Sequence, residues 1–262
     1  MMPVHWEAAV KQLARALESD AVARDRAGGH AAEARALVRA SGLLSLTTPE
    51  AFGGAGRSWR EFHRGLRRIA QADSALAHLY AFHHLQVATV LLYGTPDQHA
   101  ALLVPTVRER LFWGNALNPN DTRALALEDG DGWRIDGPKG YCSGAVGADR
   151  LTVSAWHAAS GSLLIAVLPA DRMGVSIEHD WDAFGQKQTD SGTVRFDRVR
   201  VHAHEVLVAP GAAPTPRQTL RSQLAQLVLT SLYAGLARDR KSTRLNSQSR
   251  VDISYAVFCL KK

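Results

Sequence analysis

The stretch Pro138-Lys-Gly-Tyr-Cys-Ser-Gly-Ala-Val-Gly-Ala-Asp-Arg150 decides how this chain is interpreted. Tyr141 and Cys142 have β-character, Ser143 is followed by small residues and closely spaced glycines, and a predicted strand over residues 151–156 comes next. Because no bulky side chain follows the serine, its backbone and hydroxyl can approach a flat ligand closely. An ordinary Gly-rich hairpin turn is the alternative, and the neighbouring segments decide between the two.

The composition is that of a globular protein without a disulfide framework. Hydrophobic residues make up 46% and charged residues 21% of the 262 positions. The two cysteines, Cys142 and Cys259, lie far apart, which fits a reducing cytoplasm. No stretch reaches about 18 apolar residues, and the N-terminus lacks the pattern of a signal peptide. We therefore predict a cytoplasmic protein with no membrane partner.

The net charge of +6 is concentrated at the C-terminus, where residues 241–262 contribute +4. The composition changes abruptly at Lys241, and this segment resembles the translated adapter sequence that ends many predicted proteins from draft assemblies. We therefore expect residues 241–262 to be a non-native tail and exclude it from fold reasoning. Without the tail the charge is nearly balanced, so no nucleic-acid partner is predicted.

Helical periodicity fills the first 110 residues. Helices are predicted over residues 6–27, 31–40, 58–72, 75–93 and 95–110, with Ser58 and Thr95 as N-caps. The helix over 75–93 is apolar nearly all round and therefore buried. The Gly- and Pro-rich segment 46–56 is a connecting loop rather than a phosphate loop, because no Gly-Lys-Ser/Thr follows it.

The apolar periodicity changes from helical to two at Leu111. Strand candidates and two hairpins follow, with turns at 129–132 and 158–161. After a linker over 209–216, an apolar helix over 217–238 needs partner helices. The predicted fold class is α+β: an all-α N-terminal domain (1–110), an antiparallel β-barrel (111–208) and the first helix of a C-terminal helical bundle (209–240).

Three motifs in this order resemble the acyl-CoA dehydrogenase superfamily. They are the loop over 48–56 (Thr-Pro-Glu-Ala-Phe-Gly-Gly-Ala-Gly), the stretch over 139–150 and the segment over 182–201. Together they cover most of residues 1–240. The resemblance implies that the stretch over 139–150 faces a flavin.

The segment Trp113–Asp121 favours one branch of this superfamily. Dehydrogenases usually carry Thr-Glu and Gly-Ser-Asp here, and this chain has neither. With Tyr141, Ser143 and Trp181, the chain resembles dibenzothiophene monooxygenase and related sulfur-compound monooxygenases. In that branch the fold holds reduced flavin, usually FMN from a separate reductase, and oxygen adds to the flavin.

The resemblance also implies a set of site residues. On the buried helix, His84 or His83 would hold the oxygen adduct of the flavin; His84 is preferred because it shares a face with Tyr80. Ser143 would reach flavin N5 and take part in catalysis. The predicted cofactor contacts are Trp113, Asn115, Asn118, Tyr141, Cys142 and Ser143, and the predicted substrate contacts are Tyr80 and Trp181. Aromatic barrel core is an equal alternative for Tyr141 and Trp181, and no metal site is predicted.

Three functions remain open on the sequence. The first is a reduced-flavin monooxygenase acting on a small organic, sulfur-containing compound. The second is an acyl-CoA dehydrogenase using FAD, and the third is an inactive truncated fragment of such an enzyme. The resemblance implies flavin (FMN or FAD), a flavin reductase as partner for a monooxygenase, and a homotetramer for the full-length protein.

Overall fold

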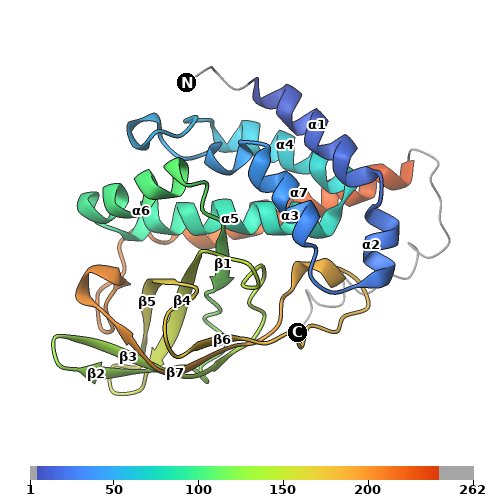
Figure 1. Ribbon diagram of the computed structural model, residues 1–262. Coiled ribbons are helices and arrows are strands. Elements are labelled where there is room, and N and C mark those ends of the chain that lie inside the picture. Colours follow the sequence, from blue (N-terminus) through green and yellow to red (C-terminus); the bar gives the residue numbers. More distant parts are fainter. Residues whose placement is uncertain (1–4, 242–262) are drawn as a thin grey trace.

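The computed structural model describes residues 5–241. Its helices form a layer that lies over a β-sheet domain (Figure 1). The chain builds the helical layer first and the sheet second, and it returns to the helices with its last described element. The predicted α+β order of helices, sheet and C-terminal helix is confirmed.

Six helices precede the sheet in the described chain. They are α1 (Trp6–Glu18), α2 (Ala21–Ala27), α3 (Ala32–Ala40), α4 (Trp59–Ala72), α5 (Ser74–Tyr93) and α6 (Pro96–Arg108). A single helix over 6–27 is wrong, because the chain leaves helical geometry at Asp20, whose φ is −134°. Two short 3₁₀ turns, Leu43–Ser45 and Glu50–Phe52, lie in and beside the predicted connecting loop.

Side-chain caps fix where α4 and α6 begin. The Ser58 hydroxyl accepts the Glu61 N–H at 3.3 Å, and the Glu61 carboxylate accepts the Ser58 N–H at 2.9 Å. Thr95 and Gln98 make the same reciprocal pair, with Pro96 at the first helical position. Each box satisfies two backbone donors that a helix start leaves unpaired. Both predicted caps are confirmed.

Helix α5 is the centre of the helical layer. It packs against α3, α4, α6 and α7, and it also contacts β1 of the sheet. Its length and composition would suit a membrane span, but 78% of its apolar window is buried inside the protein. A helix that is apolar on all sides and surrounded by protein is a core helix.

Within residues 5–241 the sheet has eight strands. Seven follow the order β6-β7-β3-β2-β4-β5-β8, and β1 pairs with β4 off this path. The strands are β1 (Trp113–Ala116), β2 (Leu125–Asp129), β3 (Gly132–Lys139), β4 (Arg150–His157), β5 (Ser162–Pro169), β6 (Val175–Ile177), β7 (Val194–Val201) and β8 (Val206–Val208).

The predicted antiparallel barrel is wrong on two counts. Strand β1 runs parallel to β4, with Trp113 opposite Arg150, and β2 meets β4 in parallel at Leu125 and Trp156. The strand path also ends at β6 and β8, so the sheet is not a closed barrel. A period of two in the sequence fixes which faces a strand shows, but not its direction or its partner.

Both predicted hairpins are confirmed. Asp129 lies opposite Gly132 across the β2–β3 turn, where Gly130 has a φ of +62°. Glycine adopts this left-handed conformation without a steric penalty. In the β4–β5 hairpin His157 lies opposite Ser162, so four residues form the loop.

The described residues form three hydrophobic clusters. One lies among α1, α3, α4, α5 and α7, and a second fills the inside of the sheet. The third joins α5 and α6 to the sheet through Val87, Val90, Leu103, Trp113 and Ile165. This third cluster therefore fixes the position of α5 relative to the sheet, and the candidate site lies where they meet.

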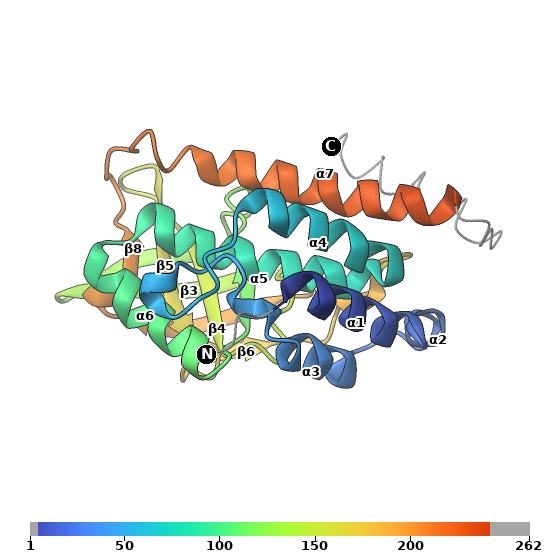
Figure 2. The same ribbon diagram turned by 90° about the horizontal axis from the view of Figure 1, so that it is seen from above.

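The last described helix, α7 (Leu220–Lys241), packs along α4 and α5 (Figure 2). A Cβ added at Gly235 would lie 2.7 Å from the Cβ of Ala70, so this glycine allows the helices to approach closely. The helix is shifted by three residues from the predicted 217–238. The rest of the predicted tail, beyond Lys241, lies outside the described residues.

Candidate functional site

Helix α5 turns one partly exposed strip toward the sheet domain. Of residues 75–90, His78 and Phe82 alone keep partial exposure. A spacing of four residues places them on one helix face. Their rings stack with centroids 4.1 Å apart and planes 10° apart. The two rings therefore form a small, flat wall.

His78 meets the serine of the motif that opened the sequence analysis. Its Nε2 atom lies 3.1 Å from the Oγ atom of Ser143, which is itself 2.8 Å from the Oγ atom of Ser191. Burial lowers the pKa of His78 to about 4, so the ring is neutral at pH 7. A neutral imidazole can donate one hydrogen bond and accept another. The Ser143 hydroxyl is thus held from both layers.

A tight turn presents Ser143. The expected β-character of Tyr141 and Cys142 is not found, because β3 ends before them and Tyr141 has a left-handed φ of +58°. Such a conformation costs a non-glycine residue about 1–2 kcal/mol. The N–H of Cys142 donates to the carbonyl of Gly192, and that of Gly144 to the carbonyl of Thr189, each at 2.9 Å. These bonds hold the turn in its strained shape.

Asn115 of β1 lies beside this turn. Its N–H donates to the Ser143 carbonyl at 3.0 Å, and its Nδ2 lies 3.5 Å from the Tyr141 carbonyl. From α5, the Gln86 amide donates to the Asn115 Oδ1 at 3.1 Å. The Oε1 atom of Gln86 is buried without a hydrogen-bond partner among the described residues. Gln86 therefore orients Asn115 through its amide nitrogen, and its Oε1 atom remains able to accept a hydrogen bond.

Asn118 ties the end of β1 to the sheet. Its N–H donates to the Ser154 hydroxyl at 3.1 Å, and its Nδ2 lies 3.5 Å from the Gly140 carbonyl. At the end of β3, the buried Lys139 ammonium donates to the carbonyl of Asp121, which lies in the loop that follows β1. Burial lowers the Lys139 pKa to about 8. Asn118 thus borders the site turn and helps to anchor it.

Trp113 and Cys142 lie inside the protein. Trp113 is 1% exposed, and its indole N–H donates to the Thr106 hydroxyl at 2.9 Å. Cys142 belongs to the sheet core, and burial raises the pKa of its thiol to about 12. In this structure both side chains are part of the buried core next to the site.

Tyr141 and Trp181 form an aromatic pair next to the turn. Their ring centroids are 6.1 Å apart, and the Tyr141 side chain is 69% exposed. The Trp181 indole donates to the Gln186 carbonyl at 3.0 Å, which fixes its position. The sequence left open a ligand contact or the barrel core for Tyr141, and its exposure rules out the barrel core.

His83 and His84 are fully buried and fully hydrogen-bonded. Their Nε2 atoms donate to the backbone carbonyls of residues 43–44, at 2.9 and 3.0 Å. The Nδ1 of His83 accepts the Trp113 N–H, and the Nδ1 of His84 accepts the Thr47 hydroxyl. Burial keeps both pKa values well below the usual range. Neither ring has a nitrogen left for a ligand, so this geometry gives no support to their predicted catalytic role.

Tyr80 lies in the same helical core. Its ring stacks on Phe62 at 5.5 Å and meets the edge of His84 at 4.7 Å. The prediction that Tyr80 and His84 share a face of α5 is confirmed. The side chain is fully buried, and burial raises the pKa of its hydroxyl. The structure places Tyr80 away from the His78–Ser143 contact, on another face of α5.

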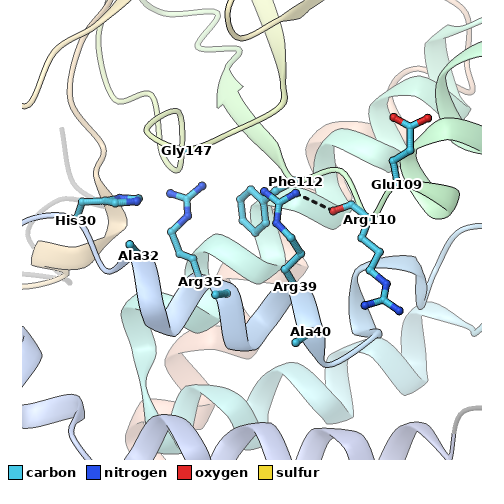
Figure 3. A pocket seen from close by; sticks show the side chains of 10 residues that line it. His30, Ala32, Arg35, Arg39, Ala40, Glu109, Arg110, Phe112 and Gly147 are labelled. Carbon is cyan, nitrogen blue, oxygen red and sulfur yellow. Dashed lines mark hydrogen bonds between the residues drawn. The ribbon is translucent and has the colours of Figure 1, made fainter.

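A groove of about 350 Å³ reaches the site turn from the side of α3 (Figure 3). Arg35 lies over the Phe112 ring at 4.6 Å and donates to the Gly144 carbonyl at 3.1 Å. Arg39 donates to the Arg110 carbonyl at 3.0 Å. Arg35 of this groove thus holds the turn at the Gly144 carbonyl.

Comparison with known proteins agrees with this architecture. Residues 6–110 match the acyl-CoA dehydrogenase N-terminal domain. Over 232 residues the chain is 45% identical to the probable FMNH2-dependent monooxygenase SfnC of Pseudomonas putida, covering 88% of this chain and 58% of the relative. It is 37% identical to the dibenzothiophene monooxygenase of Rhodococcus erythropolis, covering 88% and 59%. The chain belongs to the acyl-CoA dehydrogenase superfamily.

Solved structures of this superfamily superpose on most of the chain. The methanesulfinate monooxygenase MsuC from Pseudomonas fluorescens is 41% identical with a TM-score of 0.86, covering 91% of this chain and 61% of MsuC. TdsC from Paenibacillus sp. A11-2, in complex with FMN and indole, is 36% identical with a TM-score of 0.82, covering 88% and 61%. The chain thus spans about three-fifths of the length of these superfamily members.

Sequence reasoning within the superfamily missed His78, Gln86 and Ser191. One signal could have revealed the first, because His78 and Phe82 share a helix face that contains neither Tyr80 nor His84. A polar Gln86 in an apolar helix was a second signal, since buried amides are held by partners. No sequence signal places Ser191 against Ser143, because their contact spans 48 residues and depends on the fold.

Proposed function

We propose that the protein is a reduced-flavin monooxygenase that acts on a small organosulfur compound, with FMN as its flavin. The observation that carries this proposal is the contact between His78 and Ser143 beside Asn115. It places a neutral imidazole, a hydroxyl and an amide where the helical layer meets the sheet. Similarity to SfnC, dibenzothiophene monooxygenase and FMN-bound TdsC supports the choice of chemistry.

The residues around the turn fit a flavin. Flat aromatic surface comes from Tyr141 and Trp181, and it suits the face of a tricyclic ring. Polar atoms at one edge come from Ser143 and Asn115, and the buried Oε1 of Gln86 accepts no hydrogen bond within the described chain. Gly114 has no side chain to separate β1 from the turn. Apolar surface combined with a few fixed polar groups is typical of the residues that line cofactor sites.

Bound reduced flavin would supply the electrons and the reaction with oxygen. The chain's own residues would bind the flavin, orient it and exclude water from the site. His78 would hold a proton at Nε2 beside the reacting edge, because its neutral state at pH 7 allows it to donate and to accept. Ser143 would fix the ring edge, and Asn115 would keep the Ser143 carbonyl in place. Phe82 would keep water from the imidazole by covering its face.

Substrate and partners follow from the same proposal. Tyr141 and Trp181 would border the substrate, and a separate flavin reductase would deliver the reduced flavin. We further infer a cytoplasmic homotetramer without nucleic-acid or membrane partners. The half-exposed leucines of α7, Leu220 and Leu227, support packing of this helix against further helices.

The test is an oxygenation assay with purified protein, FMN, NADH, a flavin reductase and oxygen. Methanesulfinate and dibenzothiophene are the first two substrates. We expect an oxygenated product that requires the reductase. A medium-chain acyl-CoA with an artificial electron acceptor serves as the counter-assay. Electron transfer from the thioester without oxygenation of either sulfur compound would contradict the proposal.

A further inference from the structure

Three buried hydroxyls continue the contact of His78 into the protein. Ser143 Oγ lies 2.8 Å from Ser191 Oγ, which lies 2.8 Å from Thr189 Oγ1. The row ends where Thr189 donates to the carbonyl of Gln186 at 2.9 Å. Ser143, Ser191 and Thr189 are each at most 5% exposed, so the row is shielded from bulk water.

The carbonyl at its end sets the direction of the whole row. A carbonyl oxygen can only accept, and each hydroxyl has one hydrogen to donate. Thr189 donates its only hydroxyl hydrogen to the Gln186 carbonyl, so Ser191 must donate to Thr189. Ser143 must then donate to Ser191. The remaining contact requires His78 to donate from Nε2 to the Ser143 oxygen. No other assignment makes all four contacts hydrogen bonds.

This direction leaves one lone pair of the Ser143 oxygen unused. Its hydrogen is taken by Ser191, and one lone pair is taken by His78. A hydroxyl oxygen has two lone pairs, so the second remains for a ligand. Ser143 therefore offers a ligand an acceptor and not a donor.

The segment that carries Thr189 and Ser191 is built to hold this direction. Gln186 and Asp190, at the two ends of the 3₁₀ turn Lys187–Thr189, have left-handed φ values of +57° and +44°. The surrounding structure must hold such residues, because the conformation is costly for non-glycine side chains. Asp190 is held by His30, whose Nδ1 lies 2.6 Å from its carboxylate.

We propose that Thr189 and Ser191 are positioning residues that make Ser143 a hydrogen-bond acceptor, and thereby select reduced over oxidised flavin. The reduced ring carries a hydrogen on N5, whereas N5 of the oxidised ring carries a lone pair and can only accept. An acceptor at Ser143 would form a hydrogen bond with the N5–H group of the reduced ring. Against the oxidised ring it would bring two lone pairs together, and no hydrogen bond would form. This inference rests on the proposed function, since it assumes that a flavin edge meets Ser143.

The first test needs no flavin. In protein labelled with ¹⁵N-histidine, long-range ¹H–¹⁵N spectra at pH 7 report which ring nitrogen carries the proton, and His78→Gln identifies the signals. We expect the Nε2–H tautomer in the wild type and in Thr189→Ser, which keeps the hydroxyl. Thr189→Val removes the anchor, so the Nδ1–H form should gain population. An Nδ1–H tautomer in the wild type, or a Thr189→Val spectrum identical to wild type, would overturn the proposal.

The second test compares dissociation constants for reduced FMN, titrated anaerobically, and for oxidised FMN. We expect the wild type to prefer reduced FMN and Thr189→Val to lose about tenfold of that preference, roughly one hydrogen bond's worth. Ser191→Ala should lose it too, because it frees the Ser143 hydrogen. Thr189→Ser should keep it, and so should Ser160→Ala, which removes an exposed hydroxyl in the β4–β5 loop.

The two tests separate failure of the inference from failure of the proposed function. If neither form of FMN binds the wild type, the proposed function fails, and the tautomer still reports the direction of the row. If both forms bind and neither Thr189→Val nor Ser191→Ala changes the ratio, the selection mechanism is wrong. Thermal unfolding of each variant shows whether a lost preference comes from a folded protein.

Discussion

The Nε2 atom of His78 lies 3.1 Å from the Oγ atom of Ser143, although 65 residues separate them in the chain. The contact joins the central helix of the helical layer to the tight turn of the sheet domain. Both residues lie on rigid supports, because α5 is buried and the turn is held by backbone hydrogen bonds. A site built in this way keeps its geometry without a ligand.

Exchanging histidines on α5 separates the site from the core. His78→Phe keeps a flat ring but loses the hydrogen bond to Ser143, so product per reduced flavin should fall at least tenfold, with hydrogen peroxide formed instead. His84→Phe should keep coupled oxygenation. It should lower the free energy of unfolding by about 1–3 kcal/mol, because the Leu43 carbonyl and Thr47 lose their partner. If His84→Phe uncoupled the reaction and His78→Phe did not, the result would contradict the placement of the site.

Buried neutral histidines make the fold sensitive to acid. Burial lowers the pKa of His83 to about 4, below the value of about 6.5 expected in the unfolded chain. The unfolded state therefore binds more protons as the pH falls below 6.5, and stability is lost in that direction. We expect His83 alone to cost about 2 kcal/mol between pH 7 and pH 5. Urea unfolding at both values measures the loss, and His83→Gln should show a smaller one.

Gly114 sets the distance between β1 and the site turn. A Cβ there would lie 2.8 Å from the Ala145 Cα and 2.9 Å from the Gly144 carbonyl oxygen, so Gly114→Ala must displace the turn. We expect FMN affinity to fall at least tenfold. The control is Gly161→Ala, where a Cβ meets no atom within 4 Å and the cost is the left-handed φ of +61°. Equal FMN affinity in the two variants would show that the turn does not position the flavin.

The sequence predicted most of the fold and part of the site, for different physical reasons. Periodicity and caps located α4, α5, α6 and both hairpins, because these features depend on local geometry. Strand direction was mistaken, since the parallel pairing of β1 with β4 depends on how distant segments meet.

At the site, the motif around Ser143 was found because glycine and serine spacing is visible in one stretch. Asn115 was found for the same reason, and its backbone does bond to Ser143. The preference for His84 over other histidines rested on its shared face with Tyr80, and that face points into the helical core. Burial, which decides between His78 and its neighbours, follows from packing and not from spacing alone.

The central claim is that the flavin ring lies against the turn around Ser143, and a crystal structure with FMN tests it most directly. The account predicts that the ring lies beside Tyr141, with its N5 edge within hydrogen-bond distance of the Ser143 Oγ and His78 next to it. A flavin ring bound in the groove of Arg35 and Arg39, or anywhere without contact to Ser143, would contradict the account.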